Sequence, residues 1–83
     1  MYTVYVLMDR EGKIYKGMTN NLARRILEHK SGHTQTTARM KNISIVYQET
    51  CKDFTTARKR ELYLKTAAGR RFLKKVLPYY IRP

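Results

Sequence analysis

Two tyrosines ten residues apart are the first candidates for chemistry in this chain. Tyr5 and Tyr15 lie in two apolar runs, residues 2–8 and 13–18, which a short turn can join as a hairpin. Side chains alternate in direction along a strand, so Tyr5 and Tyr15 can share one face, near Gly17. A glycine at that position leaves room for another backbone or a phosphate. The structural alternative is an ordinary cross-strand aromatic pair.

A helix predicted over residues 21–30 directs two polar side chains toward the same region. Leu22, Arg25, Ile26 and His29 are spaced i, i+3, i+4 and i+7, so they form one stripe. The two apolar residues should face the sheet, which draws Arg25 and His29 to that side. A guanidinium matches phosphate oxygens as a bidentate donor, so Arg25 is a candidate phosphate clamp. The alternatives are an Arg25 that only snorkels and a His29 that only caps the helix.

A carboxylate interrupts the inward stripe of the second predicted helix, which begins at Thr55 or Thr56 and runs to about Thr66. Ala57, Glu61, Leu64 and Ala68 follow the spacing i, i+4, i+7 and i+11. Burying an unpaired carboxylate is costly, so Glu61 needs a partner. Two explanations remain open: a structural salt bridge, for instance with Arg25, or a divalent metal. Mg²⁺ needs only one or two protein carboxylates, so one glutamate suffices.

The composition favours a polyanionic partner and one small domain over residues 1–83. Eighteen Lys and Arg stand against six acids, giving a net charge of +12. The positive charge is spread along the chain, which favours nucleic acid over a membrane surface, and DNA is the expected form. Cys51 is the single cysteine, so no internal disulfide can form and we expect a cytoplasmic protein. The first residues have the pattern of a strand, not of a cleavable signal.

Basic side chains that could contact a nucleic-acid backbone occur in several predicted elements. These candidates are Lys16, Arg24, Arg39, Lys41, Arg58, Arg70 and Arg71. Such contacts give salt-dependent and largely non-specific affinity. For several of them the alternative of a solvated surface must hold, and Arg24 can also pair with Glu28 at i, i+4.

The predicted fold class is α/β (α+β), with a small three-stranded mixed or antiparallel sheet flanked by three helices in the order β-β-α-β-α-α. Gly12 should make the hairpin turn, and Gly32 should end the first helix. Ala67-Ala68-Gly69 should break or bend the second helix. The predicted strands cover 2–8, 13–18 and 43–50, the helices 21–30, 55–66 and 70–76, and an exposed loop 31–42.

Taken in order, these pieces resemble the GIY-YIG nuclease family. The chain carries Thr3-Val4-Tyr5, Tyr15-Lys16-Gly17, the helix from Leu22 to His29, and Arg60-Glu61-Leu62-Tyr63-Leu64-Lys65. The resemblance extends from Tyr2 to about Leu77 and is strongest to small stand-alone members. These are similar to the N-terminal nuclease domain of excinuclease C.

The resemblance implies a role for each of five residues. Tyr5 would act as, or position, the base for the attacking water, and Tyr15 would contact the phosphate region. Arg25 would stabilise charge on the transferred phosphate, His29 would assist proton transfer, and Glu61 would bind a single Mg²⁺ or Mn²⁺. The implied activity is a metal-dependent DNA endonuclease, with a role in DNA repair or recombination.

Two departures from the family pattern motivate an alternative function: Met18 stands where excinuclease relatives carry a lysine, and no asparagine follows Asn42. Thr3 and Lys16 also differ from the family's motif residues, but at positions that vary within the family. A non-catalytic nucleic-acid-binding module of the same fold is therefore the alternative, and an RNA-associated protein is a third idea. A protein partner of unknown identity is compatible with each.

Overall fold

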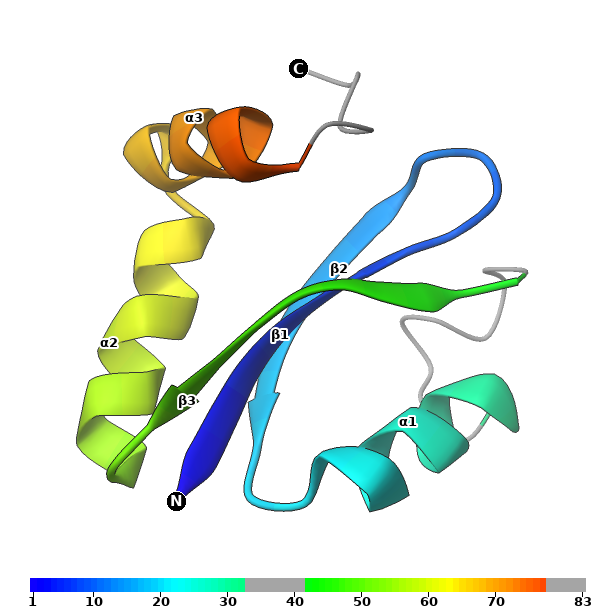
Figure 1. The fold of residues 1–83 in the computed structure, drawn as a ribbon, viewed down its shortest axis with the longest axis horizontal. Helices are drawn as coiled ribbons and strands as arrows, with labels where there is room; N and C mark the ends of the chain where they lie inside the picture. Colours follow the sequence, from blue (N-terminus) through cyan, green and yellow to red (C-terminus); the bar gives the residue numbers. More distant parts are fainter. Residues whose placement is uncertain (33–41, 78–83) are drawn as a thin grey trace.

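The computed structural model describes residues 1–32 and 42–77, in which three strands and three helices follow the predicted order (Figure 1). The strands are β1 (Tyr2–Met8), β2 (Ile14–Thr19) and β3 (Ser44–Cys51); the helices are α1 (Leu22–Lys30), α2 (Phe54–Leu64) and α3 (Ala67–Val76). Most of the loop predicted over 31–42 and the tail after residue 77 lie outside the described residues. No helix in the described part of the chain is long and apolar enough to cross a membrane.

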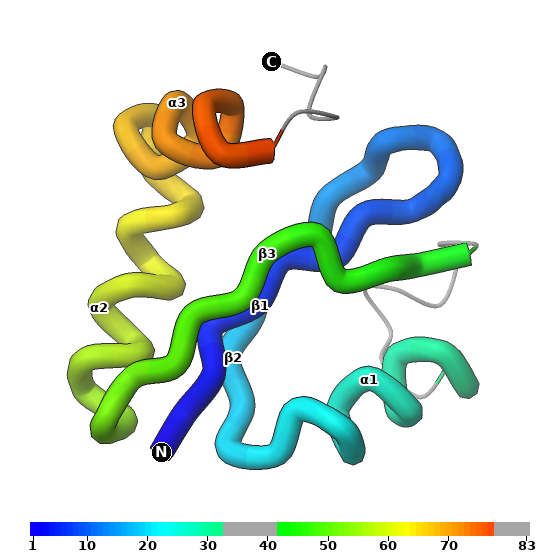
Figure 2. Tube along the Cα trace, in the orientation of Figure 1, coloured from blue at the N-terminus to red at the C-terminus, as the bar shows by residue number. Residues whose placement is uncertain are grey.

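The sheet is antiparallel throughout, with the strand order β2-β1-β3, so β1 is central. The path of β1 between β2 and β3 can be followed in Figure 2. Gly12 has φ +87° and makes the hairpin turn as predicted, a conformation that glycine adopts without strain. The resulting register sets Tyr5 opposite Gly17 and Leu7 opposite Tyr15, so the two tyrosines share a face as expected.

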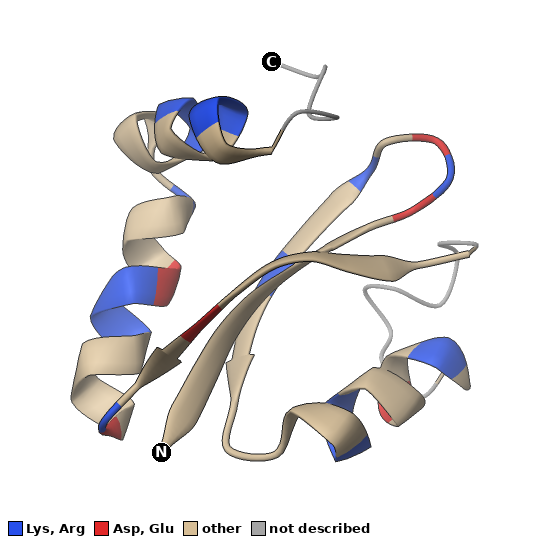
Figure 3. Ribbon diagram, viewed as in Figure 1, with Lys and Arg blue, Asp and Glu red and all other residues tan. Residues whose placement is uncertain are grey.

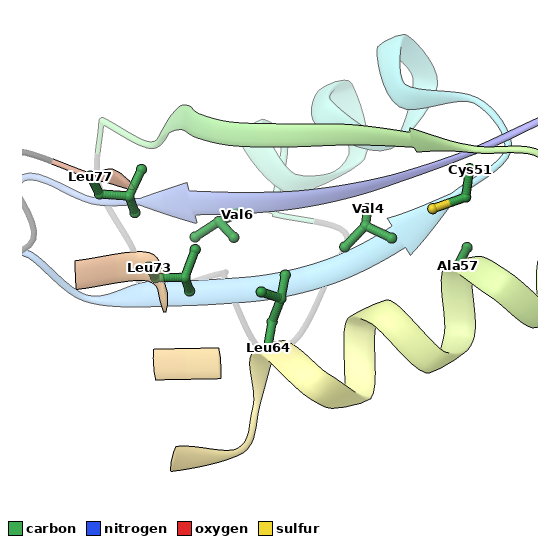
Figure 4. Close-up of a cluster of buried hydrophobic side chains, with 7 residues drawn as sticks. All are labelled: Val4, Val6, Cys51, Ala57, Leu64, Leu73 and Leu77. Carbon is green, nitrogen blue, oxygen red and sulfur yellow. The ribbon is translucent and has the colours of Figure 1, made fainter. Parts of the chain in front are cut away.

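The two faces of the sheet are covered by different helices, because alternate β1 residues point in opposite directions. Val4 and Val6 pack under α2 and α3, in the larger of two apolar clusters (Figure 4). Tyr5 and Leu7 point the other way, into a smaller cluster that α1 covers with Leu22 and Ile26. The larger cluster consists of Val4, Val6, Cys51, Ala57, Leu64, Leu73 and Leu77. As a result, α1 and α2 lie on opposite sides of the strands.

The break between the last two helices is not where the sequence predicted it. α2 ends at Leu64, and Thr66 caps α3 by accepting a hydrogen bond from the Gly69 N–H to its Oγ1 (3.1 Å). Gly69 therefore lies inside α3, where a Cβ would collide with the Tyr63 carbonyl. This glycine permits close helix packing and does not break a helix. Ala68, predicted on the inward stripe of α2, belongs to α3 and is exposed.

A cluster of aromatic and charged side chains fixes α2 and α3 against β3. The Arg60 guanidinium lies between the rings of Tyr63 and Phe72, 4.9 and 4.8 Å from their centroids. Its Nε donates to Glu49 Oε1 at 3.0 Å, and the Tyr47 hydroxyl donates to the same oxygen at 2.6 Å. Arg60 is therefore held on both sides, and we interpret it as a structural residue.

Candidate functional site

Four of the five predicted catalytic side chains meet on the face that α1 covers: Tyr5, Tyr15, Arg25 and His29. Tyr5 is fully buried and His29 is 2% exposed, and the Tyr5 hydroxyl is 2.9 Å from His29 Nε2. The Tyr15 ring lies edge-on to the His29 ring, with centroids 4.9 Å apart. The His29 ring therefore points inward to Tyr5. The alternative, a His29 that only caps the helix, is wrong.

Gly17 supplies the space that brings Tyr5 to this position. A Cβ on Gly17 would lie 2.7 Å from the Tyr5 hydroxyl oxygen, 2.8 Å from Cζ and 3.0 Å from Tyr15 Cε2. The space predicted for a backbone or a phosphate is therefore filled by the Tyr5 ring. Because of this, a side chain of the central strand can extend across β2 toward the edge of the sheet.

Arg25 lies beside both tyrosines, as the helix stripe predicted. Its Nη1 donates to Glu28 Oε1 at 3.0 Å, and hydrogen bonds with Tyr5 first, then Glu28, and finally Tyr15 raise the pKa of its guanidinium. The Arg25 side chain is 34% exposed, so the guanidinium is anchored while still accessible from solvent. The salt bridge suggested between Arg25 and Glu61 does not form. Arg25 pairs with Glu28, and Glu61 pairs with Arg58 and Lys65.

The environment keeps both Tyr5 and His29 neutral near pH 7. Burial is the largest effect on Tyr5 and raises the pKa of its hydroxyl, although the hydrogen bond from Arg25 opposes this. Burial, followed by the positive charge of Arg25, lowers the pKa of His29 below 6.5. A guanidinium can only donate, so the Tyr5 oxygen is the acceptor in its interaction with Arg25. In the tautomer in which His29 Nε2 carries no proton, the Tyr5 hydroxyl donates to that nitrogen across 2.9 Å.

Glu61 approaches from the other side of the sheet. It lies on α2 between the buried residues Ala57 and Leu64, with a side chain 9% exposed, as the inward stripe predicted. Its Oε1 accepts from Arg58 Nη1 at 2.8 Å, and its Oε2 is 3.3 Å from Lys65 Nζ. The charge of Glu61 is among the influences that raise the Tyr5 pKa, so the two groups are within electrostatic reach.

The donor set at Glu61 suits a hard divalent cation that keeps most of its own ligands. The described residues contain no group of three or more His, Cys, Asp or Glu side chains that could hold a metal. A single carboxylate is nevertheless enough for Mg²⁺, which fills its other positions with water and substrate oxygens. The Arg58 and Lys65 groups already contact the carboxylate oxygens as cations, so a positive ion fits there chemically.

The predicted nucleic-acid contacts are distributed over several elements, and Figure 3 shows Lys and Arg on all three helices. Lys16 is half-buried on β2, and Arg71 is exposed on α3. Arg24 pairs with Glu28, Nε to Oε2 at 3.7 Å, as the i, i+4 spacing predicted. Arg58 and Arg70 contact Glu61 and the Lys65 carbonyl, respectively. Arg39 and Lys41 lie outside the described residues.

Lys65 belongs to this region, although it was not among the predicted site residues. It follows Glu61 at i+4, the spacing at which a helical glutamate meets a lysine, so the sequence does contain the signal. The inward position of Glu61 on its helix predicted a partner on another element instead. The structure shows that the carboxylate finds its partners on its own helix and at that helix's end.

Comparisons with known proteins give one consistent result. A family model described as the GIY-YIG catalytic domain matches residues 1–75. A UPF0213 protein of Desulfotalea psychrophila is 43% identical over 65 residues, which cover 75% of this chain and 58% of that protein. A UPF0213 protein of Autographa californica nuclear polyhedrosis virus is 34% identical over 74 residues, covering 87% of this chain and 71% of that protein. The solution NMR structure of a UPF0213 protein from Bacillus halodurans has 27% identity and a TM-score of 0.57, covering 96% of this chain and 92% of that one.

Proposed function

The chain belongs to the GIY-YIG family, as the resemblance of its sequence predicted, and on that premise we propose that it is a metal-dependent endonuclease that hydrolyses DNA. The observation that carries the proposal is the buried bond between the Tyr5 hydroxyl and His29 Nε2, with Arg25 beside it. A positioned proton acceptor next to an anchored cation is what phosphodiester hydrolysis requires.

The protonation states of Tyr5 and His29 support a proton path for the attacking water. The water oxygen would form the new bond to phosphorus and the bond from phosphorus to the leaving oxygen would break, while the water proton passes to the Tyr5 oxygen. The phenolic proton would move at the same time to His29 Nε2, 2.9 Å away. Neutral His29 can accept that proton because burial and Arg25 keep its pKa low. Tyr5 would thereby act as base without first becoming a phenolate.

Arg25 would hold the scissile phosphate. Its partial exposure leaves donor N–H groups available, and the bond to Glu28 Oε1 fixes its direction in advance. A pre-oriented guanidinium stabilises the negative charge that develops on phosphoryl oxygens and needs little reorganisation to do so. The edge-on Tyr15 ring supports His29 and closes the same side of the site.

Glu61 is the residue that would hold the metal, Mg²⁺ or Mn²⁺. When bound, such an ion supplies Lewis acidity to the phosphate and stabilises the leaving oxygen. The contribution of the chain itself is a carboxylate near Tyr5 whose burial requires a positive partner. The net charge of +12 would attract the polyanionic substrate.

The test is cleavage of labelled single-stranded, duplex, flap and junction DNA with Mg²⁺ or Mn²⁺. Glu61→Ala and Arg25→Ala should each lower the single-turnover rate by about 10²–10³-fold while circular dichroism stays unchanged. Arg24→Ala removes the same charge from the same helix and should weaken binding, with the rate at saturating enzyme retained. If Glu61→Ala and Arg25→Ala both cut like the wild type, the assigned site is wrong. A preference for flaps or junctions would favour a role in DNA repair or recombination.

A second candidate is a binding module that retains the fold without cleavage. It is favoured by the pairing of both Glu61 oxygens with cations from α2 and the residue that ends it. A pure binder should show salt-sensitive affinity that is indifferent to Mg²⁺ beyond its ionic strength, and should give no product with either metal. Tighter binding to RNA than to DNA of equal length would indicate an RNA-associated protein.

A further inference from the structure

Glu61 carries more positive partners than its charge requires. Arg58 Nη1 is 2.8 Å from one carboxylate oxygen and Lys65 Nζ is 3.3 Å from the other. One of these cations would be enough to neutralise the buried carboxylate. The longer contact is that of Lys65, whose ammonium is a point charge on a flexible stem.

The two partners reach Glu61 from solvent. Their side chains are 52% and 49% exposed, whereas that of Glu61 is 9% exposed. Either cation can therefore leave without opening a cavity in the core, and the carboxylate cannot follow it. Glu61 is a fixed anion, and Lys65 is a movable cation placed on it.

Lys65 has two other cations as neighbours. Arg70 Nη1 donates to the Lys65 carbonyl at 3.1 Å, which brings the start of α3 to the end of α2. Lys16 lies opposite Val6 on β2, on the face that α2 covers. Partial burial, followed by the charges of Arg70 and Lys65, lowers the pKa of Lys16, so both of these charges repel the Lys16 ammonium. Such a cluster would be stabilised by an anion.

We propose that Lys65 is an exchangeable counter-ion: it neutralises Glu61 in the metal-free protein, and moves to a nucleic-acid phosphate, beside Lys16 and Arg70, when a divalent cation takes the carboxylate. This inference rests on the proposed function, because it assumes that Glu61 binds the metal and that DNA is the ligand. Lys65 then binds substrate directly and couples metal binding to substrate binding. The site it forms with Lys16 and Arg70 takes a phosphodiester next to the one that is cut.

The first test measures Mn²⁺ affinity without DNA, by titration calorimetry or by the EPR signal of the free ion. Lys65→Met keeps the aliphatic stem and removes the competing cation, so it should tighten Mn²⁺ binding by roughly fivefold. Lys74→Met is the matched control, since it removes the same charge from the exposed surface of α3, and it should change the affinity less than about twofold. Glu61→Gln should abolish the binding.

The second test needs no metal and no cleavage. In EDTA, Glu61→Gln should release Lys65 and tighten binding to a duplex, measured by fluorescence anisotropy, by roughly fivefold. The same substitution should have under half that effect in the Lys65→Met background and its full effect in the Lys74→Met background. Equal effects of Glu61→Gln in both backgrounds would overturn the exchange.

The outcomes separate this inference from the proposed function. If Glu61→Gln leaves the Mn²⁺ affinity unchanged, Glu61 does not bind the metal, and both the metal assignment and the exchange are wrong. Binding that depends on Glu61, but that Lys65→Met and Lys74→Met tighten equally, would overturn the exchange alone and leave the proposed nuclease standing.

Discussion

Replacing Gly17 with alanine should damage both the stability of the protein and the geometry of its site. The added methyl would lie 2.7 and 2.8 Å from Tyr5 Oη and Cζ, well inside the usual carbon contact of about 3.5–4.0 Å. Tyr5 is fully buried and its hydroxyl is bonded to His29, so the ring cannot move without breaking that bond. The hydroxyl is therefore displaced from His29.

The expected cost follows from two opposing effects. Overpacking of a filled interior costs about 1–3 kcal/mol. Alanine at position 17 also lowers the backbone entropy of the unfolded chain, which stabilises the folded protein by about 0.5–1 kcal/mol. At the middle of these ranges the net loss is about 1 kcal/mol, which should lower the melting temperature by roughly 4–8 °C for a domain of this size. Urea denaturation monitored by circular dichroism measures the change in unfolding free energy directly.

A double-mutant cycle with Tyr5→Phe identifies the cause of that loss. Phenylalanine removes Oη, the atom closest to the new methyl, so the penalty of Gly17→Ala should fall by about 0.5–1 kcal/mol in that background. DNA cleavage by Gly17→Ala should fall as well, because the Tyr5 hydroxyl moves away from His29. A Gly17→Ala protein as stable as the wild type, or a penalty unchanged by Tyr5→Phe, would refute the packing argument.

Three further perturbations test other parts of the structure. The pKa of His29 is lowered below 6.5 on folding, so the unfolded chain binds its proton first and stability should fall as the pH drops from about 7.5 to about 5.5. His29→Asn should flatten that dependence, measured by urea denaturation at both pH values. Arg60→Met should cost about 1–2 kcal/mol of unfolding free energy, because two ring contacts and the bond to Glu49 disappear, whereas Lys59→Met should stay within about 0.5 kcal/mol. DNA affinity should fall linearly with the logarithm of salt concentration, and Arg70→Ala or Arg71→Ala should each reduce the slope by about 0.9 if that residue contacts a phosphate.

Local rules were sufficient for much of the fold and for the grouping of the site residues. The two-residue period of a strand set Tyr5 and Tyr15 on one face, and the helical period brought Arg25 and His29 to it. Asn21 caps α1 by accepting from the Arg24 N–H, a role that an asparagine side chain fills through local geometry alone. These features depend on residues close together in the sequence, so they can be predicted from one sequence alone.

What the sequence did not predict depends on contacts between distant segments or on how helices pack. Glycine usually disfavours a helix, yet Gly69 lies inside α3. At this position the Tyr63 carbonyl leaves no room for a side chain, so only glycine fits. The space beside Gly17 was predicted for a ligand, and it is filled by a side chain whose reach across β2 no periodicity reveals. The bond from Tyr5 to His29 needs the sheet, the glycine and α1 together.

The edge of β2 is where the two halves of the candidate site can meet. Tyr5, Tyr15, Arg25 and His29 belong to the face under α1, whereas Glu61 and Lys65 belong to α2 and its end on the opposite face. A continuous wall of side chains along β2 would keep them apart. Gly17 has no side chain there, and the Tyr5 ring occupies the space beside it. From α2, the negative charge of Glu61 contributes to the raised pKa of Tyr5. If the chain is the proposed nuclease, Glu61 would hold the metal on one side of this edge and Arg25 would hold the phosphate on the other, so β2 would be the strand across which the two groups act on one substrate.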